Sequence, residues 1–127
     1  FEHEAWDTAQ VVSQIGSRHM EVIERWGEML RSNRYVRRSW LGEDMLSRGT
    51  WSEPIIVLAP EPGACYPDGQ PLPQPYCLLE GHHRLGYLRS MATDELPLQP
   101  EHQVWICRPV RDTQTFLPAN PASEINF

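Results

Sequence analysis

One stretch of the sequence, residues 76–88, constrains the fold more than any other. It begins with the apolar run YCLL, passes through Glu80 and Gly81, and continues with Leu85 and Leu88 at helical spacing. A short apolar run bounded by turn residues predicts a buried strand, and apolar residues three or four apart predict a helix face. The chain is therefore expected to contain a strand that turns at a glycine directly into a helix.

This strand–glycine–helix turn carries the residues with the clearest chemical potential. The first N–H groups of a helix have no intrahelical acceptor, so a helix N-terminus favours anions. Gly81 allows a sharp turn and a close approach by a ligand. His82, His83 and Arg84 add side-chain donors at the same place, and an Arg fork can hold a phosphate through two hydrogen bonds. Glu80 ends the strand and is a candidate metal ligand or base.

The rest of the chain predicts further strands and helices around this turn. Asp7 followed by Gln10 resembles a capping box, which predicts a helix start near Thr8. A proline-rich loop at 61–75 separates two strands. The predicted elements are one or two helices within residues 8–38, with Ser17 as the candidate cap of the second, a helix at 41–48 ending at Gly49, strands at 55–58, 76–79 and 104–107, and a helix at 84–91. This order predicts an α/β (α+β) fold with a small mixed sheet and packed helices.

Length and composition predict a single folded domain over residues 1–127. The chain is 40% hydrophobic and 22% charged, which is typical of a globular protein, and it has no apolar run long enough for a membrane helix. Within the domain we expect a helical N-terminal part at 1–40, a core at 41–107 and an irregular tail at 108–127. The expected anchors of the tail are Phe116, Leu117 and Phe127.

The net charge and the cysteine content indicate which binding partners and which cellular compartment to expect. The net charge of −6 disfavours duplex nucleic acid. Arginines at 31, 34, 37 and 38, next to Tyr35 and Trp40, predict a solvated helix end rather than a nucleic-acid patch. Three cysteines without a Cys-x-x-Cys pair predict free thiols in a reducing cytoplasm. Adjacent histidines on a helix point about 100° apart, so we expect no metal site at His82 and His83.

The turn Gly81-His82-His83-Arg84 resembles the Gly-x-[His/Arg]-Arg turn of the ParB/sulfiredoxin superfamily. The preceding helix, Gly49 and the strand Pro54-Ile55-Ile56-Val57 resemble a second block of ParB-like domains. A strand at 103–107 is a third match. The resemblance covers residues 41–107 and implies a ParB/sulfiredoxin-like fold with an N-terminal helical extension.

The resemblance implies a nucleoside triphosphate site, with ATP or CTP and Mg²⁺ at the turn. By position, Gly81, His83 and Arg84 would contact phosphates, and His82 stands where sulfiredoxins have their catalytic cysteine. The implied activity is an ATP- or CTP-dependent phosphotransferase or NTPase. Glu80 and His82 are the catalytic candidates. The base could also come from Glu53 or Asp44.

Two other functions stay open at this point. The first is a non-catalytic interaction module, such as an antitoxin, an immunity protein or a complex subunit. It would hold a protein partner through the N-terminal helices or the proline-rich loop. The second is a DNA-binding or nuclease-type ParB-like protein, which the acidic balance of the chain disfavours.

Overall fold

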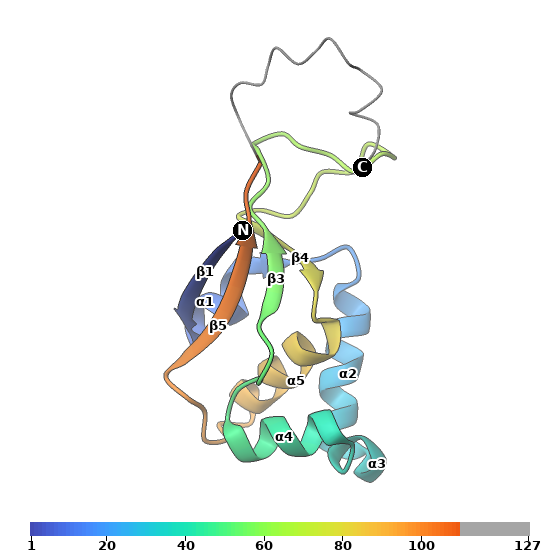
Figure 1. Ribbon diagram of the computed structural model, residues 1–127. Coiled ribbons are helices and arrows are strands. Elements are labelled where there is room, and N and C mark those ends of the chain that lie inside the picture. The colour runs from blue at the N-terminus through green and yellow to red at the C-terminus, as the bar shows by residue number, and fades with distance from the viewer. Residues whose placement is uncertain (110–127) are drawn as a thin grey trace.

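A computed structural model describes residues 1–109 and joins five strands into one mixed sheet (Figure 1). The strands are β1 (Glu2–Asp7), β2 (Ile15–Gly16), β3 (Ile55–Leu58), β4 (Tyr76–Glu80) and β5 (Glu101–Cys107). Their spatial order is β1-β5-β3-β4-β2. The pairs β1–β5 and β3–β4 are antiparallel, whereas β5–β3 and β4–β2 are parallel. The prediction of a small mixed sheet with packed helices is thus confirmed.

Five helices accompany the sheet within the described residues. They are α1 (Thr8–Gln14), α2 (Met20–Ser32), α3 (Arg34–Arg37), α4 (Trp40–Arg48) and α5 (His82–Thr93). Figure 1 shows α1 and α5 behind the sheet, α2 beside α5, and α3 with α4 below them. No helix within residues 1–109 is long and apolar enough to cross a membrane.

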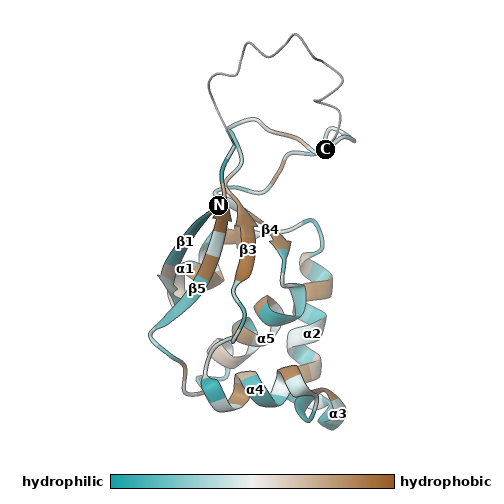
Figure 2. Ribbon diagram, viewed as in Figure 1, coloured by the Kyte–Doolittle hydropathy of each residue, from teal (hydrophilic) through white to brown (hydrophobic). Residues whose placement is uncertain are grey.

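The hydrophobic core lies between the sheet and the helices. Residues of β5 alternate, so that His102, Val104 and Ile106 are buried while Gln103 and Trp105 are exposed. This alternation is typical of a sheet with one covered face. Figure 2 shows apolar residues concentrated on the central strands β3 and β4. The covered face of the sheet therefore supports α5 and the turn that precedes it.

Capping residues define the ends of several helices. Asp7 and Gln10 form the predicted capping box at the start of α1. Ser39 accepts a hydrogen bond from the Gly42 N–H and begins α4. Gly49 ends α4 with a φ of 76°, in the left-handed region that glycine adopts without strain. The predicted strands at 55–58 and 76–79 are also confirmed, the second extending to Glu80.

The prediction that residues 1–40 are helical is wrong in part. Strands β1 and β2 both lie in this segment and form the two edges of the sheet. Strand β1 is mostly exposed, and Trp6 is its one fully buried residue. Its sequence therefore lacks the apolar run by which a buried strand is predicted. The predicted Ser17 cap is also displaced, because α2 begins at Met20 with His19 as its N-cap.

The proline-rich loop folds back on itself between β3 and β4. The Tyr66 N–H donates to the Gln70 carbonyl, and the Leu72 N–H donates to the Ala64 carbonyl. Arg18 from the β2–α2 connection stacks on the Tyr66 ring, with its guanidinium carbon 3.8 Å from the ring centre. The loop is therefore attached to the N-terminal part of the chain. The predicted anchors Phe116, Leu117 and Phe127 lie outside the described residues.

Candidate functional site

The turn between β4 and α5 requires a glycine at position 81. Gly81 has a φ of 112°, a conformation that side-chain-bearing residues rarely adopt. A Cβ atom at this position would lie 2.6 Å from Ile55 Cγ2 on β3. The prediction of a sharp strand-to-helix turn is confirmed, and its cause is both the backbone conformation and the close approach of β3.

The N-terminus of α5 is open. The first backbone bond of the helix runs from the Leu85 N–H to the Gly81 carbonyl, at 2.8 Å, and no side chain caps the helix within the described chain. The N–H groups of residues 82–84 therefore precede the hydrogen-bonded part of the helix. In front of them lies a hollow of about 370 Å³, which we call the turn hollow. It is lined by Leu41, Glu80, Gly81, His82, His83 and Arg84.

The two histidines of the turn face different neighbours. His82 is half-buried, and its ring centre lies 6.1 Å from that of His19. His83 is exposed and meets the Trp26 ring edge-on, with 4.0 Å between the ring centres. Desolvation lowers the pKa of both histidines, with a smaller contribution from His19 at His82 and from His82 at His83. Both rings are therefore biased toward the neutral form, in which one nitrogen donates and the other accepts.

Arg84 lies at the turn hollow, but part of its hydrogen-bonding capacity is used inside the protein. Its Nη1 donates to the carbonyls of Glu53 and Pro54, at 2.9 and 2.8 Å. Its Nη2 lies 3.4 Å from Glu80 Oε1, and only 15% of the side chain is exposed. Arg84 thus ties the start of α5 to the segment that leads into β3. The sequence did not predict this structural role, because it does not show which backbone carbonyls a side chain will contact.

The three carboxylate candidates lie in different surroundings. Glu80 lines the turn hollow, and 64% of its side chain is exposed. Glu53 is exposed and belongs to the segment that Arg84 holds. Asp44 accepts a hydrogen bond from Arg48, while its Oδ2 is buried without a partner among the described residues. Of the three, Glu80 is the one that borders the turn hollow directly.

His82 also lines a second hollow, of about 290 Å³, which we call the Tyr66 hollow. Its polar side chains come from the β2–α2 connection, the proline-rich loop, β4 and α5. They are Ser17, Arg18, His19, Tyr66, Cys77 and His82. The Tyr66 hydroxyl lies 3.6 Å from the sulfur of Cys77, which is buried. Sequence reasoning missed this grouping because it placed residues 17–19 within the helical segment.

Within residues 1–109, no group of three or more His, Cys, Asp or Glu side chains is arranged to hold a metal ion. Comparisons with protein-family models, with curated proteins and with solved structures give no match. The fold and the site thus define a mixed α/β protein with an open helix N-terminus at a glycine turn.

Proposed function

We propose that the chain binds the phosphate groups of a nucleoside triphosphate in the turn hollow. The observation that carries the proposal is the open N-terminus of α5, which follows a glycine and borders a hollow of about 370 Å³. Unpaired N–H groups and the partial positive charge of the helix favour an anion at this place. The neutral rings of His82 and His83 would add hydrogen-bond donors.

Each residue of the turn has a proposed role. Gly81 sets the left-handed turn that places the open amides at the turn hollow, and His83 donates to a phosphate oxygen. Arg84 supplies positive charge while its bonds to Glu53 and Pro54 hold the turn in place. Glu80 is the proposed ligand of the Mg²⁺ that accompanies ATP or CTP. A charged guanidinium, open amides and an exposed carboxylate are consistent with a Mg²⁺–triphosphate ligand.

The proposed reaction is phosphoryl transfer or triphosphate hydrolysis. Such reactions depend mainly on positioning and on charge stabilisation, which backbone amides and an arginine can provide. His82 lines both the turn hollow and the Tyr66 hollow, so it is the proposed proton-transfer residue. Its lowered pKa favours a neutral ring that can accept a proton near neutral pH.

We also propose that residues 41–107 form a ParB/sulfiredoxin-like domain. Support comes from the order of elements, in which α4 and Gly49 precede β3, and β4 leads through the Gly81 turn into α5 and β5. His82 occupies the position of the sulfiredoxin cysteine. Cys77 is buried on the preceding strand, beside Tyr66, which disfavours sulfur reduction by the turn.

Thermal unfolding tests the nucleotide proposal with ATP, CTP, GTP and UTP, each with and without Mg²⁺. A ligand at about 100 times its dissociation constant adds about 2.7 kcal/mol, which raises the unfolding midpoint by several degrees. Arg84→Ala would disturb the turn itself, so a loss of binding in that variant could come from a change in structure. His83→Glu tests phosphate binding more directly. A carboxylate in the first turn favours the helix but repels phosphate.

The expected result is a midpoint shift in the wild type that His83→Glu abolishes. Gln103→Glu, which adds the same charge at an exposed position of β5, is the matched control and retains the shift. A folded wild-type protein that no nucleotide shifts would overturn the proposal.

A second candidate function is a protein-interaction module on the surface of α3 and α4. The observation that favours it is the exposure of two large aromatic side chains, Tyr35 at 74% and Trp40 at 71%. Arg34, Arg37 and Arg38 lie beside them and are also exposed. Aromatic and arginine side chains dominate many protein interfaces. Tyr35→Ser combined with Trp40→Ser would abolish the binding of a purified partner without altering nucleotide-induced shifts.

A further inference from the structure

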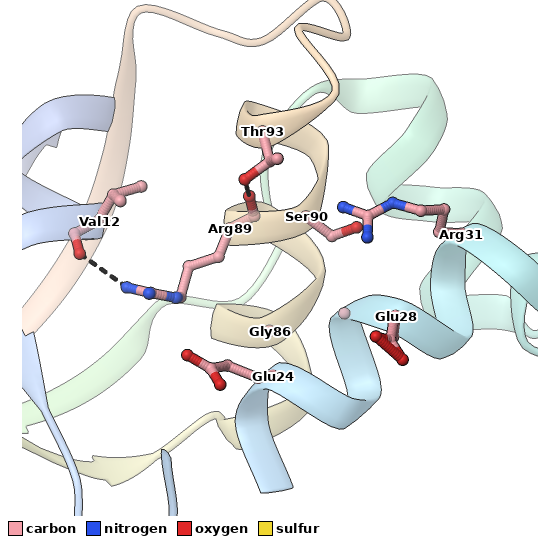
Figure 3. Close-up of a pocket in the computed structure, with 9 residues that line it drawn as sticks. Val12, Glu24, Glu28, Arg31, Gly86, Arg89, Ser90 and Thr93 are labelled. Atoms are coloured by element: carbon pink, nitrogen blue, oxygen red, sulfur yellow. Dashed lines mark hydrogen bonds between the residues drawn. The ribbon is translucent and has the colours of Figure 1, made fainter. Parts of the chain in front are cut away.

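A third hollow, of about 270 Å³, lies where α2 crosses α5 and α1 approaches them (Figure 3). We call it the crossing hollow. It shares no lining residue with the turn hollow or the Tyr66 hollow. Its charged and hydroxyl-bearing side chains are Glu24, Glu28, Arg31, Arg89, Ser90 and Thr93. The walls thus carry both signs of charge within a space suited to a small molecule.

Two glycines line the crossing hollow at the contact between the helices. A Cβ atom on Gly27 of α2 would lie 2.6 Å from the Gly86 carbonyl oxygen of α5. The backbones of the two helices therefore meet directly at this point. No side chains from positions 27 and 86 fill the space, and the longer side chains around them enclose it.

Arg89 and Glu24 bring unmatched charges to the crossing hollow. Arg89 Nη1 donates to the Val12 carbonyl of α1, at 2.7 Å, and no carboxylate among the described residues pairs with it. Glu24 has neither a hydrogen bond nor an ion pair within residues 1–109, and Figure 3 shows both side chains directed toward the same space. Arg31, by contrast, already pairs with Asp94, at 2.9 Å.

Ser90 adds a hydroxyl group to the wall of the crossing hollow. Only 7% of the residue is exposed, and its side chain lines the crossing hollow. Figure 3 shows its side chain directed from α5 toward α2. The Ser90 hydroxyl is therefore available to a molecule in the crossing hollow.

We propose that the crossing hollow binds a small zwitterion of the α-amino-acid class. The carboxylate of the ligand would accept from the free N–H groups of Arg89 and from the Ser90 hydroxyl. Its ammonium group would lie near Glu24 and Glu28, which are one turn apart on α2. A purely anionic ligand would meet the two glutamates, and a purely cationic one would meet Arg89, which no carboxylate of the described residues pairs with. A molecule with one positive and one negative group can place each group near the side chains of opposite charge.

Titration of the ¹⁵N-labelled chain by NMR tests the proposal with L-alanine, L-serine and L-glutamine as probes. Ethylamine and propionate carry one of the two charges each and are the matched single-charge probes. The expected result is a saturable shift of amide signals from residues 24–31 and 86–93 with at least one amino acid. Binding of either single-charge probe is expected to be at least about tenfold weaker.

Two variants separate binding from folding. Glu24→Gln, at an exposed position, is expected to weaken binding by about tenfold or more, and Ser90→Ala to weaken it as well. Glu21→Gln is the matched control, because Glu21 is an exposed glutamate of α2 outside the crossing hollow. The proposal is overturned if no amino acid gives a saturable shift, if Glu24→Gln binds like the wild type, or if ethylamine binds as tightly as the amino acids.

Discussion

His102 on β5 is a fully buried histidine with hydrogen-bond partners on both sides of its ring. Its Nε2 lies 2.8 Å from the Thr8 hydroxyl at the start of α1, and its Nδ1 lies 2.6 Å from the Thr50 hydroxyl. A neutral ring matches this arrangement, since each hydroxyl can donate or accept. Burial lowers the pKa of His102, partly offset by the nearby Asp7. The folded state therefore holds this residue neutral.

We expect the free energy of unfolding to fall as the pH drops below about 6.5, the ordinary histidine pKa. Since the folded-state pKa of His102 is lowered, the unfolded chain binds its proton first, and the stabilisation is lost between that value and the folded pKa. Urea unfolding at a series of pH values measures this. His102→Gln should reduce the pH dependence, whereas Gln103→Asn, a change at an exposed and uncharged position of the same strand, should leave it as in the wild type.

Gly81 is the residue on which the turn depends, and its replacement gives a second prediction. Gly81→Ala should destabilise the fold by about 1–3 kcal/mol from backbone strain, with about 1–3 kcal/mol more from the contact with Ile55. Gly69→Ala is the matched control, because Gly69 has a φ of 91° but a Cβ atom there would face open space, with no neighbour within 4 Å. Denaturant unfolding gives the loss of stability for both variants. The loss in Gly69→Ala reports the backbone strain alone, and the additional loss in Gly81→Ala reports the steric overlap with Ile55. Equal losses of stability would contradict the role of Ile55.

At the scale of elements, the contact between α2 and α5 depends on glycines that let two backbones meet. A Cβ atom at position 86 would lie 2.3 Å from the Ile23 carbonyl oxygen. Gly86→Ala should therefore push the helices apart and destabilise the fold by about 1–3 kcal/mol. Thr93→Ala, at an exposed position of α5, is the control and should change stability by less than about 0.5 kcal/mol. Chemical unfolding gives both values.

The elements around the turn were predictable because their signals are local. The apolar strands at 55–58 and 76–79, Gly49 and the glycine turn all have a strong pattern within a few residues. Strand β1 was not predictable in this way. It is an edge strand with mostly exposed side chains, and its pairing partner β5 lies almost the whole described chain away.

The candidate site was predictable only in its backbone. The position of Gly81 and the open helix start follow from sequence, but the carbonyl partners of Arg84 do not. The Tyr66 hollow also escaped prediction, since it requires the parallel pairing of Ile15 with Tyr76 to bring residues 17–19 to β4. Contacts between distant segments leave no periodic pattern in the sequence.

At the scale of the whole molecule, β1 protects both the core and the edge of β5. Its Trp6 is only 2% exposed, and the strand pairs with β5 along its full length. A chain that lacks residues 1–7 should lose cooperative unfolding and aggregate, because an apolar surface and a strand edge become exposed. Thermal unfolding and light scattering measure this. A chain that lacks only Phe1, an exposed residue outside β1, is the control.

The strand order has a consequence for the way the chain reaches its final form during synthesis. Both edge strands come from the first sixteen residues, whereas β5, which lies between β1 and β3, is the last strand of the described sheet to be made. Both edge strands thus leave the ribosome before β3, β4 and β5, the three strands that lie between them in the sheet. Strand β1 has no partner in the sheet until residue 107 has emerged, so closure of the sheet is a late event governed by long-range contacts.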